Sequence, residues 1–149
     1  MRSKTPLVLM EQMVMLLVFA LAAALCLQAF VKSDQLSRQS ENRDRALLMA
    51  QSAAEVIQNT GGDFRQAAAL LEAQSHDKAS LTIFYGTDWK RSEPTSENVY
   101  PFGHTLGVTR QETDLPGLGR AEVWVQDDET GEELARFSVA WQEEVSGRG

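Results

Sequence analysis

An apolar run of 25 residues, Leu7 to Val31, dominates the start of the chain, and it holds one carboxylate near its beginning, Glu11. A helix needs about 20 mostly apolar residues to cross a bilayer, so this run is long enough to span a membrane. Its other polar residues are Gln12 and Gln28. An unpaired charge in hydrocarbon costs at least ~2.5–3.5 kcal/mol on insertion scales. Glu11 is therefore expected to have a partner and a function.

The start of the chain resembles bacterial type IV pilins and the pseudopilins of type II secretion or competence machines. Those proteins have a short basic leader, and the mature chain then carries apolar residues, a Glu at its fifth position and an apolar helix. Here residues 1–6, MRSKTP, match the leader, Leu7 would be the first mature residue, and Glu11 falls at the fifth position. At the junction, Pro6 stands where the family has Gly, and Leu7 stands where Phe is usual. Pro6 and Leu7 are therefore the candidate processing site of a divergent member.

The resemblance implies a structural subunit of an envelope filament or of a secretion or DNA-uptake machine. In pilins the Glu at the fifth position pairs with the amino terminus of a neighbouring subunit, so Glu11 is the implied residue of subunit assembly. Without cleavage after Pro6, Glu11 would pair with Lys4 of a neighbour or stay protonated. The implied partners are the membrane and other pilin-like subunits or assembly-machine proteins.

A cleaved secretory signal is the alternative interpretation of the apolar run. Arg2 and Lys4 form a basic start, and Ala22 to Ala24 offer a small-residue cleavage motif. The run continues beyond that motif to Val31, which favours an uncleaved anchor. Basic residues flank both ends, so their distribution does not decide the orientation. We place the N-terminus in the cytoplasm, and the C-terminal domain outside it, because the leader resembles pilin and signal sequences.

Small residues in the run suggest how the predicted helix packs. Ala20 and Ala24 share one helix face, and small side chains let membrane helices approach closely. An Ala-rich helix that simply faces lipid is the alternative. Cys26, the only cysteine, is interpreted as a small apolar residue. Leu25 before it does not fit a lipoprotein signal.

Composition and motifs limit the function of the remaining chain. Residues 32–149 hold 12 Lys and Arg against 20 Asp and Glu, a net charge of −8. Such a domain repels nucleic acid, so we expect no direct nucleic-acid binding by the monomer. The sequence has no nucleophile-elbow serine and no glycine-rich phosphate loop. We therefore expect no enzyme activity, no cofactor and no small-molecule substrate.

The helix is predicted to continue beyond the membrane. Residues 32–45 contain neither Gly nor Pro, and apolar residues recur every three to four positions from Ala46 to Ile57. Gly61-Gly62 then favours a helix end. We predict one helix from about Leu7 to Asn59, with 7–31 in the membrane and 32–59 outside it. Two helices with a bend in 32–45 are the alternative.

Residues 60–149 are predicted to form a small α+β domain that packs on residues 46–57. Asp63 and Gln66 read as a capping box before a short helix that ends near Gln74. From Leu81 onward apolar and polar residues alternate with a period of two, which favours β-strands. The predicted strands are Leu81–Tyr85, Trp89–Arg91, Leu106–Thr113, Leu118–Gln126 and Glu133–Glu143. The expected fold is pilin-like, with a long transmembrane and stalk helix against an antiparallel sheet of about four strands.

The remaining candidate site residues have structural alternatives. His76 and His104 lack a ligand or nucleophile partner at a familiar spacing and are predicted to be surface or loop residues. Asp127, Asp128 and Glu129 cluster carboxylates at a predicted hairpin tip, and some pseudopilins bind calcium in a C-terminal loop. We prefer a solvated turn and expect no metal.

Three tryptophans are interpreted as core or sheet cover rather than as a ligand platform, namely Trp89, Trp124 and Trp141. The second function class that fits the sequence is a single-pass membrane protein whose small extracytoplasmic domain binds a partner without forming a filament. An assembly ATPase, platform protein or prepilin peptidase among the genomic neighbours would favour the first class.

Overall fold

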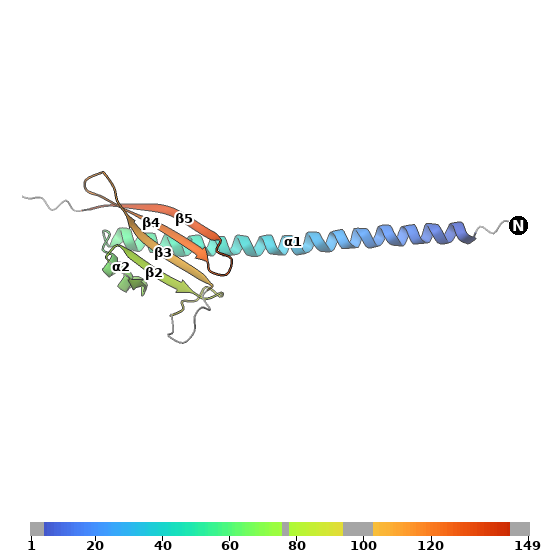
Figure 1. Cartoon of the computed structure of the whole chain (residues 1–149), viewed down its shortest axis with the longest axis horizontal. Helices are drawn as coiled ribbons and strands as arrows, with labels where there is room; N and C mark the ends of the chain where they lie inside the picture. Colours follow the sequence, from blue (N-terminus) through green and yellow to red (C-terminus); the bar gives the residue numbers. More distant parts are fainter. Residues whose placement is uncertain (1–4, 76–77, 94–102, 144–149) are drawn as a thin grey trace, which may run out of the picture. The chain divides into compact units, whose positions relative to one another are not determined.

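The structure is a computed structural model, and it describes residues 5–75, 78–93 and 103–143. It is an α+β structure with one long helix, a short helix and an antiparallel sheet (Figure 1). The elements in chain order are α1 (Thr5–Asn59), α2 (Phe64–Leu71), β1 (Gln74–Ser75), β2 (Ser80–Tyr85), β3 (His104–Gln111), β4 (Leu118–Asp127) and β5 (Glu133–Gln142). Internal contacts divide the chain into two units, Met1–Glu41 and Asn42–Gly149.

The first unit contains the N-terminal part of α1. Every side chain from Pro6 to Glu41 is exposed, and this part of the helix is long and apolar enough to cross a membrane. Pro6 lies in the first turn, where its missing N–H leaves no helical hydrogen bond unmade. Beyond the apolar run, Arg38 and Asp34 form an exposed ion pair of 3.0 Å one helical turn apart.

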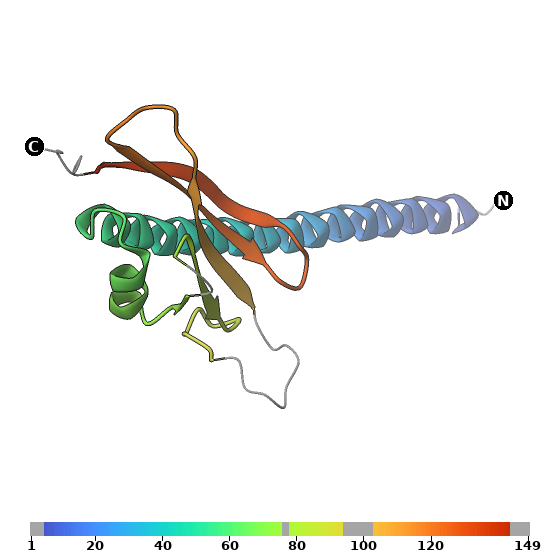
Figure 2. The same ribbon diagram turned by 60° about the vertical axis from the view of Figure 1, so that its left-hand side comes forward.

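The second unit contains the end of α1, α2 and the sheet, whose strands follow the order β1-β2-β3-β4-β5 with every pair antiparallel. The last turns of α1 run along one face of the sheet (Figure 2). The α1 side chains buried there are mostly small, which lets the helix backbone approach the strands: Ala46, Ala50, Ala53, Ala54 and Ile57. The residues that the strands add to this core alternate along each strand: Leu81, Ile83, Leu106, Val108, Ala121, Val123, Val125, Val139 and Trp141.

The end of α1 depends on two glycines with positive φ, Gly61 at 60° and Gly62 at 80°. The N–H of Gly62 donates to the carbonyl oxygen of Ile57 at 2.9 Å, which closes the last turn. Asp63 then caps α2, since its side chain accepts hydrogen bonds from the backbone N–H groups of Arg65 and Gln66. The predicted helix end and the capping role of Asp63 are confirmed.

The predicted fold class is confirmed, and α1 continues without a break through residues 32–45. Four details of the prediction were wrong. Leu47, part of the apolar stripe from Ala46 to Ile57 that was predicted to face the sheet, is 42% exposed and lies outside the core. Trp89–Arg91 forms a turn with a single bridge from Tyr85 to Arg91 instead of a strand. The two-residue β1 was missed because Gln74–Ser75 is polar, and β3 begins two residues earlier than predicted.

Candidate functional site

Glu11 lies in the first unit, on the exposed surface of α1. It shares a shallow groove with apolar neighbours on the same helix, Leu7, Val8, Met10, Val14 and Met15. Within the described residues, no ion pair or hydrogen bond satisfies the Glu11 carboxylate.

The other candidate site residues of the N-terminal segment lie on the same helix, but they do not form one site with Glu11. Pro6 and Leu7 form part of the first turn of α1, at the candidate processing site. Ala20 and Ala24 are exposed and one turn apart. Nine residues correspond to two and a half helical turns, so Ala20 lies on the helix face opposite Glu11. The Glu11 carboxylate and the Ala20/Ala24 pair thus lie on opposite faces of the helix.

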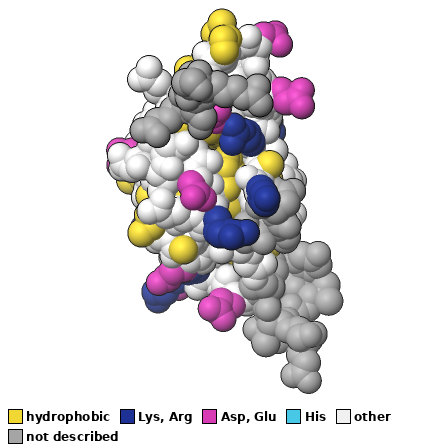
Figure 3. All heavy atoms as spheres, turned by 90° about the vertical axis from the view of Figure 1, so that its left-hand side faces the viewer, with side chains coloured by type: hydrophobic (Ala, Val, Ile, Leu, Met, Phe, Trp, Pro, Cys, Tyr) yellow, Lys and Arg dark blue, Asp and Glu magenta, His cyan; other side chains and the backbone are white. Residues whose placement is uncertain are grey.

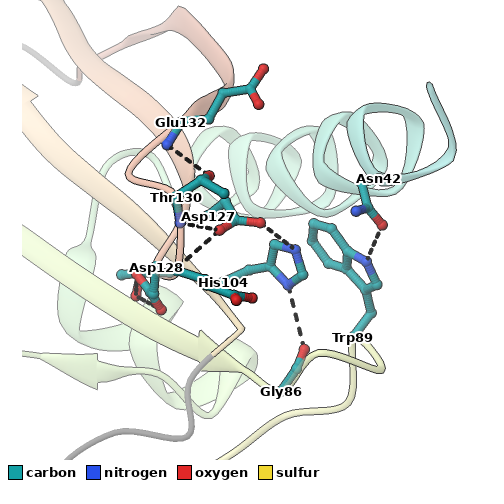
Figure 4. A network of polar contacts seen from close by, with 10 residues as sticks. Asn42, Gly86, Trp89, His104, Asp127, Asp128, Thr130 and Glu132 are labelled. Carbon is teal, nitrogen blue, oxygen red and sulfur yellow. Dashed lines mark hydrogen bonds and ion pairs between the residues drawn. The ribbon is translucent and has the colours of Figure 1, made fainter. Parts of the chain in front are cut away.

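In the second unit, the acidic residues at the β4–β5 turn hold that turn together (Figure 4). Asp127 Oδ1 accepts hydrogen bonds from the backbone N–H groups of Glu129 and Thr130, at 3.0 and 2.8 Å. The hydroxyl of Thr105 donates to both carboxylate oxygens of Asp128 at 2.8 Å. Within residues 5–75, 78–93 and 103–143, no group of three His, Cys, Asp or Glu side chains is placed to hold a metal ion.

A buried histidine lies beside this turn, and the sequence did not predict it. His104 is only 4% exposed, so its prediction as a surface or loop residue was wrong, whereas His76 lies outside the described residues. The His104 ring stacks on the Trp89 ring, with centroids 3.8 Å apart and an angle of 17° between the ring planes. His104 Nδ1 lies 3.4 Å from the carbonyl oxygen of Gly86, and Nε2 lies 3.7 Å from Asp127 Oδ2 (Figure 4).

The cluster formed by His104, Trp89 and Asp127 connects several elements of the second unit. Trp89 donates its indole N–H to the side-chain oxygen of Asn42 on α1 at 3.3 Å. Next to it, Arg43 on α1 pairs with Glu132 in the β4–β5 turn at 2.7 Å. These contacts connect α1 to the turn after β2 and to the turn after β4. The cluster has the arrangement of a structural junction, and we assign it no catalytic role.

The sequence carried a signal for His104 that the strand prediction did not use. In β3, residues 104, 106 and 108 alternate onto the face that packs on α1. Extending the period of two backward from Leu106 would have placed His104 inside. The turns that bring Trp89 and Asp127 next to His104 follow no periodic pattern that a single sequence would reveal.

Two titratable groups in or beside the turn after β2 are perturbed by their surroundings. Burial raises the pKa of Tyr85, although the nearby Arg91 guanidinium opposes the shift. The pKa of Asp88 is lowered, because its carboxylate accepts hydrogen bonds from the backbone N–H and the ammonium group of Lys90. Both residues lie in or next to the turn that carries Trp89, and their partners stabilise that turn.

The end of the domain where α1 stops presents several Lys and Arg side chains around an apolar strip (Figure 3). Arg65 and Lys78 line a pocket with the N-terminus of α2, but the Asp63 carboxylate lines it too. Arg110 lies 5.9 Å from the ring centroid of Trp141 and forms an ion pair with Glu143. Carboxylates thus accompany these cations, and the end face does not form a uniform anion-binding surface.

Comparison of the chain with protein-family models, curated protein sequences and solved structures gave no match.

Proposed function

We propose that the chain is a structural pilin-like or pseudopilin-like subunit, anchored in the membrane, that assembles into an envelope filament or a secretion or DNA-uptake machine. One observation carries the proposal. The same uninterrupted helix, α1, contains the apolar segment with Glu11 and the small-residue stripe that forms the core of the α+β unit. A subunit built in this way couples contacts within the membrane to a folded domain outside it.

The exposed apolar segment supports assembly within a membrane. All its side chains from Leu7 to Val31 are exposed, so they need lipid or neighbouring helices around them. Glu11 needs a cation in that environment, because an isolated carboxylate is costly in hydrocarbon. The amino group of a neighbour, at Leu7 after cleavage or at Lys4 without it, would supply that charge. Ala20 and Ala24 would allow close approach of a helix on the opposite face.

In the proposed topology, the N-terminus is cytoplasmic and residues 46–143 lie outside the cytoplasm. The acidic composition of residues 32–149 suits a soluble domain that does not bind anionic lipid surfaces. Protease added to intact spheroplasts should destroy the C-terminal domain and leave a cytoplasmic marker intact. Full protection of the domain in intact spheroplasts, with digestion after lysis, would contradict this topology.

The assembly role of Glu11 is tested by crosslinking in membranes. Glu11→Ala should insert at least as well as the unmodified chain, because it removes a costly charge. It should nevertheless lose crosslinks to other copies or to other pilin-like subunits. Glu11→Gln should lose most of them as well, since an amide keeps the shape without the charge. Gln12→Ala and Gln28→Ala are matched controls in the same apolar run and should retain the crosslinks.

The alternative is a single-pass membrane protein whose small outer domain binds a partner and does not form filaments. Pro6 favours it, because the family junction has Gly at that place. Crosslinking at the unmodified level in both Glu11 variants would move this alternative ahead. Mass spectrometry of the intact chain from membranes would show whether the mature N-terminus is Leu7, as a processed subunit requires.

A further inference from the structure

The three tryptophans of the second unit differ in how deeply they are buried. Trp89 and Trp141 are buried, at 7% and 6% exposed. Trp124 is only partly buried and lies on the other side of the sheet. Its neighbours in β4, Val123 and Val125, are fully buried against α1, so the alternation along the strand directs Trp124 to the outer face.

A glycine makes room for Trp124 to lie against the sheet. Gly107 on β3 is the direct cross-strand partner of Trp124 on β4. A Cβ atom at position 107 would lie 2.3 Å from Cε2 and Cζ2 of the indole, which is far inside contact distance. The indole therefore packs directly on the backbone of β3. Its position is fixed before any ligand arrives, which lowers the entropic cost of binding.

Polar groups with fixed positions stand beside the ring. Arg136 on β5 is the other cross-strand partner of Trp124. Its guanidinium forms ion pairs with Glu122 at 3.1 Å and with Glu133 at 2.6 Å. The guanidinium donates hydrogen bonds to the carboxylates of Glu133 and Glu122, and these bonds raise the pKa of Arg136. About half of the Arg136 side chain remains exposed, which leaves donors available to a ligand.

The rest of the outer face is rich in hydroxyls and has balanced charge. By alternation, β2 and β3 contribute Thr82, Phe84, Thr105 and Thr109 to it, and the Thr105 hydroxyl donates to Asp128. Beside Trp124, Arg120 and Arg136 balance Glu122 and Glu133. This face therefore has no excess of positive charge to attract nucleic acid, and it complements an uncharged ligand that offers many hydroxyl groups.

We propose that Trp124 and the Arg136–Glu122 pair bind a pyranose ring of an uncharged glycan. One face of a pyranose presents C–H groups, and the electron-rich face of an indole attracts such weakly positive edges. The sugar hydroxyls would donate to carboxylate oxygens and accept from the guanidinium in the plane around the ring. The proposal concerns the outer domain only and is independent of the assembly role of Glu11.

The test measures oligosaccharide binding to the full chain in micelles of an amine-oxide detergent, which contains no sugar. Chitotetraose and cellotetraose are titrated by calorimetry. We expect saturable binding of at least one of them, in the millimolar range or tighter. Trp124→Ala should weaken it about tenfold or more, the size of one lost stacking contact. Trp124→Phe should recover part of the loss, and Arg136→Gln should weaken binding while leaving the ring in place.

Two controls separate binding from folding. Far-ultraviolet circular dichroism and the thermal midpoint should stay close to those of the unmodified chain in each variant that is compared. Gln142→Ala, on the same face of β5 but six residues from Arg136 and paired with Leu118, should bind as the unmodified chain does. Absence of saturable binding of both oligosaccharides would overturn the proposal, and so would equal binding by Trp124→Ala. A change in oligomeric mass caused by Trp124→Ala alone would assign this face to self-association and also overturn it.

Discussion

Trp89 donates its indole N–H to the side-chain oxygen of Asn42 at 3.3 Å, which joins two residues 47 positions apart. The bond fixes the turn after β2 on α1. Trp89 has a backbone φ of 62°, which a residue with a side chain rarely adopts.

The coupling between Trp89 and Asn42 is measurable in a double-mutant cycle. Trp89→Phe and Asn42→Ala each remove one partner, and the cycle should give a coupling of about 0.5–1.5 kcal/mol in the free energy of unfolding. Chemical denaturation of the chain in micelles provides the four values. The same cycle between Trp124→Phe and Asn42→Ala should give no coupling. Additive effects at Trp89 and Asn42 would show that the bond does not stabilise the domain.

Two adjacent glycines allow backbone strain to be separated from steric clash. Gly61 and Gly62 both have positive φ, but a Cβ at Gly61 meets open space while a Cβ at Gly62 would lie 2.2 Å from the Trp141 ring. Gly61→Ala should cost about 1–2 kcal/mol of stability from the left-handed backbone alone. Gly62→Ala should cost about 1–3 kcal/mol more, from overpacking against the indole. Equal losses in thermal unfolding would mean that Trp141 does not pack on Gly62.

The buried phenol of Tyr85 predicts a loss of stability in alkali. Burial raises its pKa above the ordinary value of 10.0, so the folded chain holds this proton more tightly than the unfolded chain does. The stabilising contribution is fully present below the unfolded pKa and is lost as the pH rises through the folded pKa. From about pH 9 to about pH 11, denaturant midpoints of the unmodified chain should fall more steeply than those of Tyr85→Phe. Parallel curves would contradict this linkage.

The sequence predicted the parts of the fold that depend on local periodicity. The stripe from Ala46 to Ile57 and the alternation in β4 and β5 identified the helix and the longest strands with their buried faces. The glycines at 61 and 62 identified the end of α1, because helix termination is a local event. Alternation could not predict β1, because its two residues are both polar and form a strand only by pairing with β2.

The candidate sites were less predictable, because their geometry depends on contacts between distant segments. Glu11 was identified as a candidate because it is the one charged residue in the apolar run from Leu7 to Val31. The role of Asp127 as the cap of its own turn, and the burial of His104 beside it, follow from how β3 and β4 pair. The outward position of Trp124 was implied by alternation, but the match with Gly107 depends on a register that one sequence does not determine.

The packing of α1 on the sheet is tested by introducing one charge at two positions of the same helix. Ile57 is fully buried, so Ile57→Asp would place an unpaired carboxylate in the core and cost several kcal/mol. That is a large part of the stability of a small domain, so the thermal midpoint should fall sharply or folding should fail. Leu47→Asp makes a similar change at a residue that is 42% exposed, and it should lower the midpoint far less. Near-ultraviolet circular dichroism of the buried tryptophans reports folding in both variants. An unchanged midpoint in Ile57→Asp, or equal losses in the two variants, would mean that residues 46–57 do not form the core of the domain.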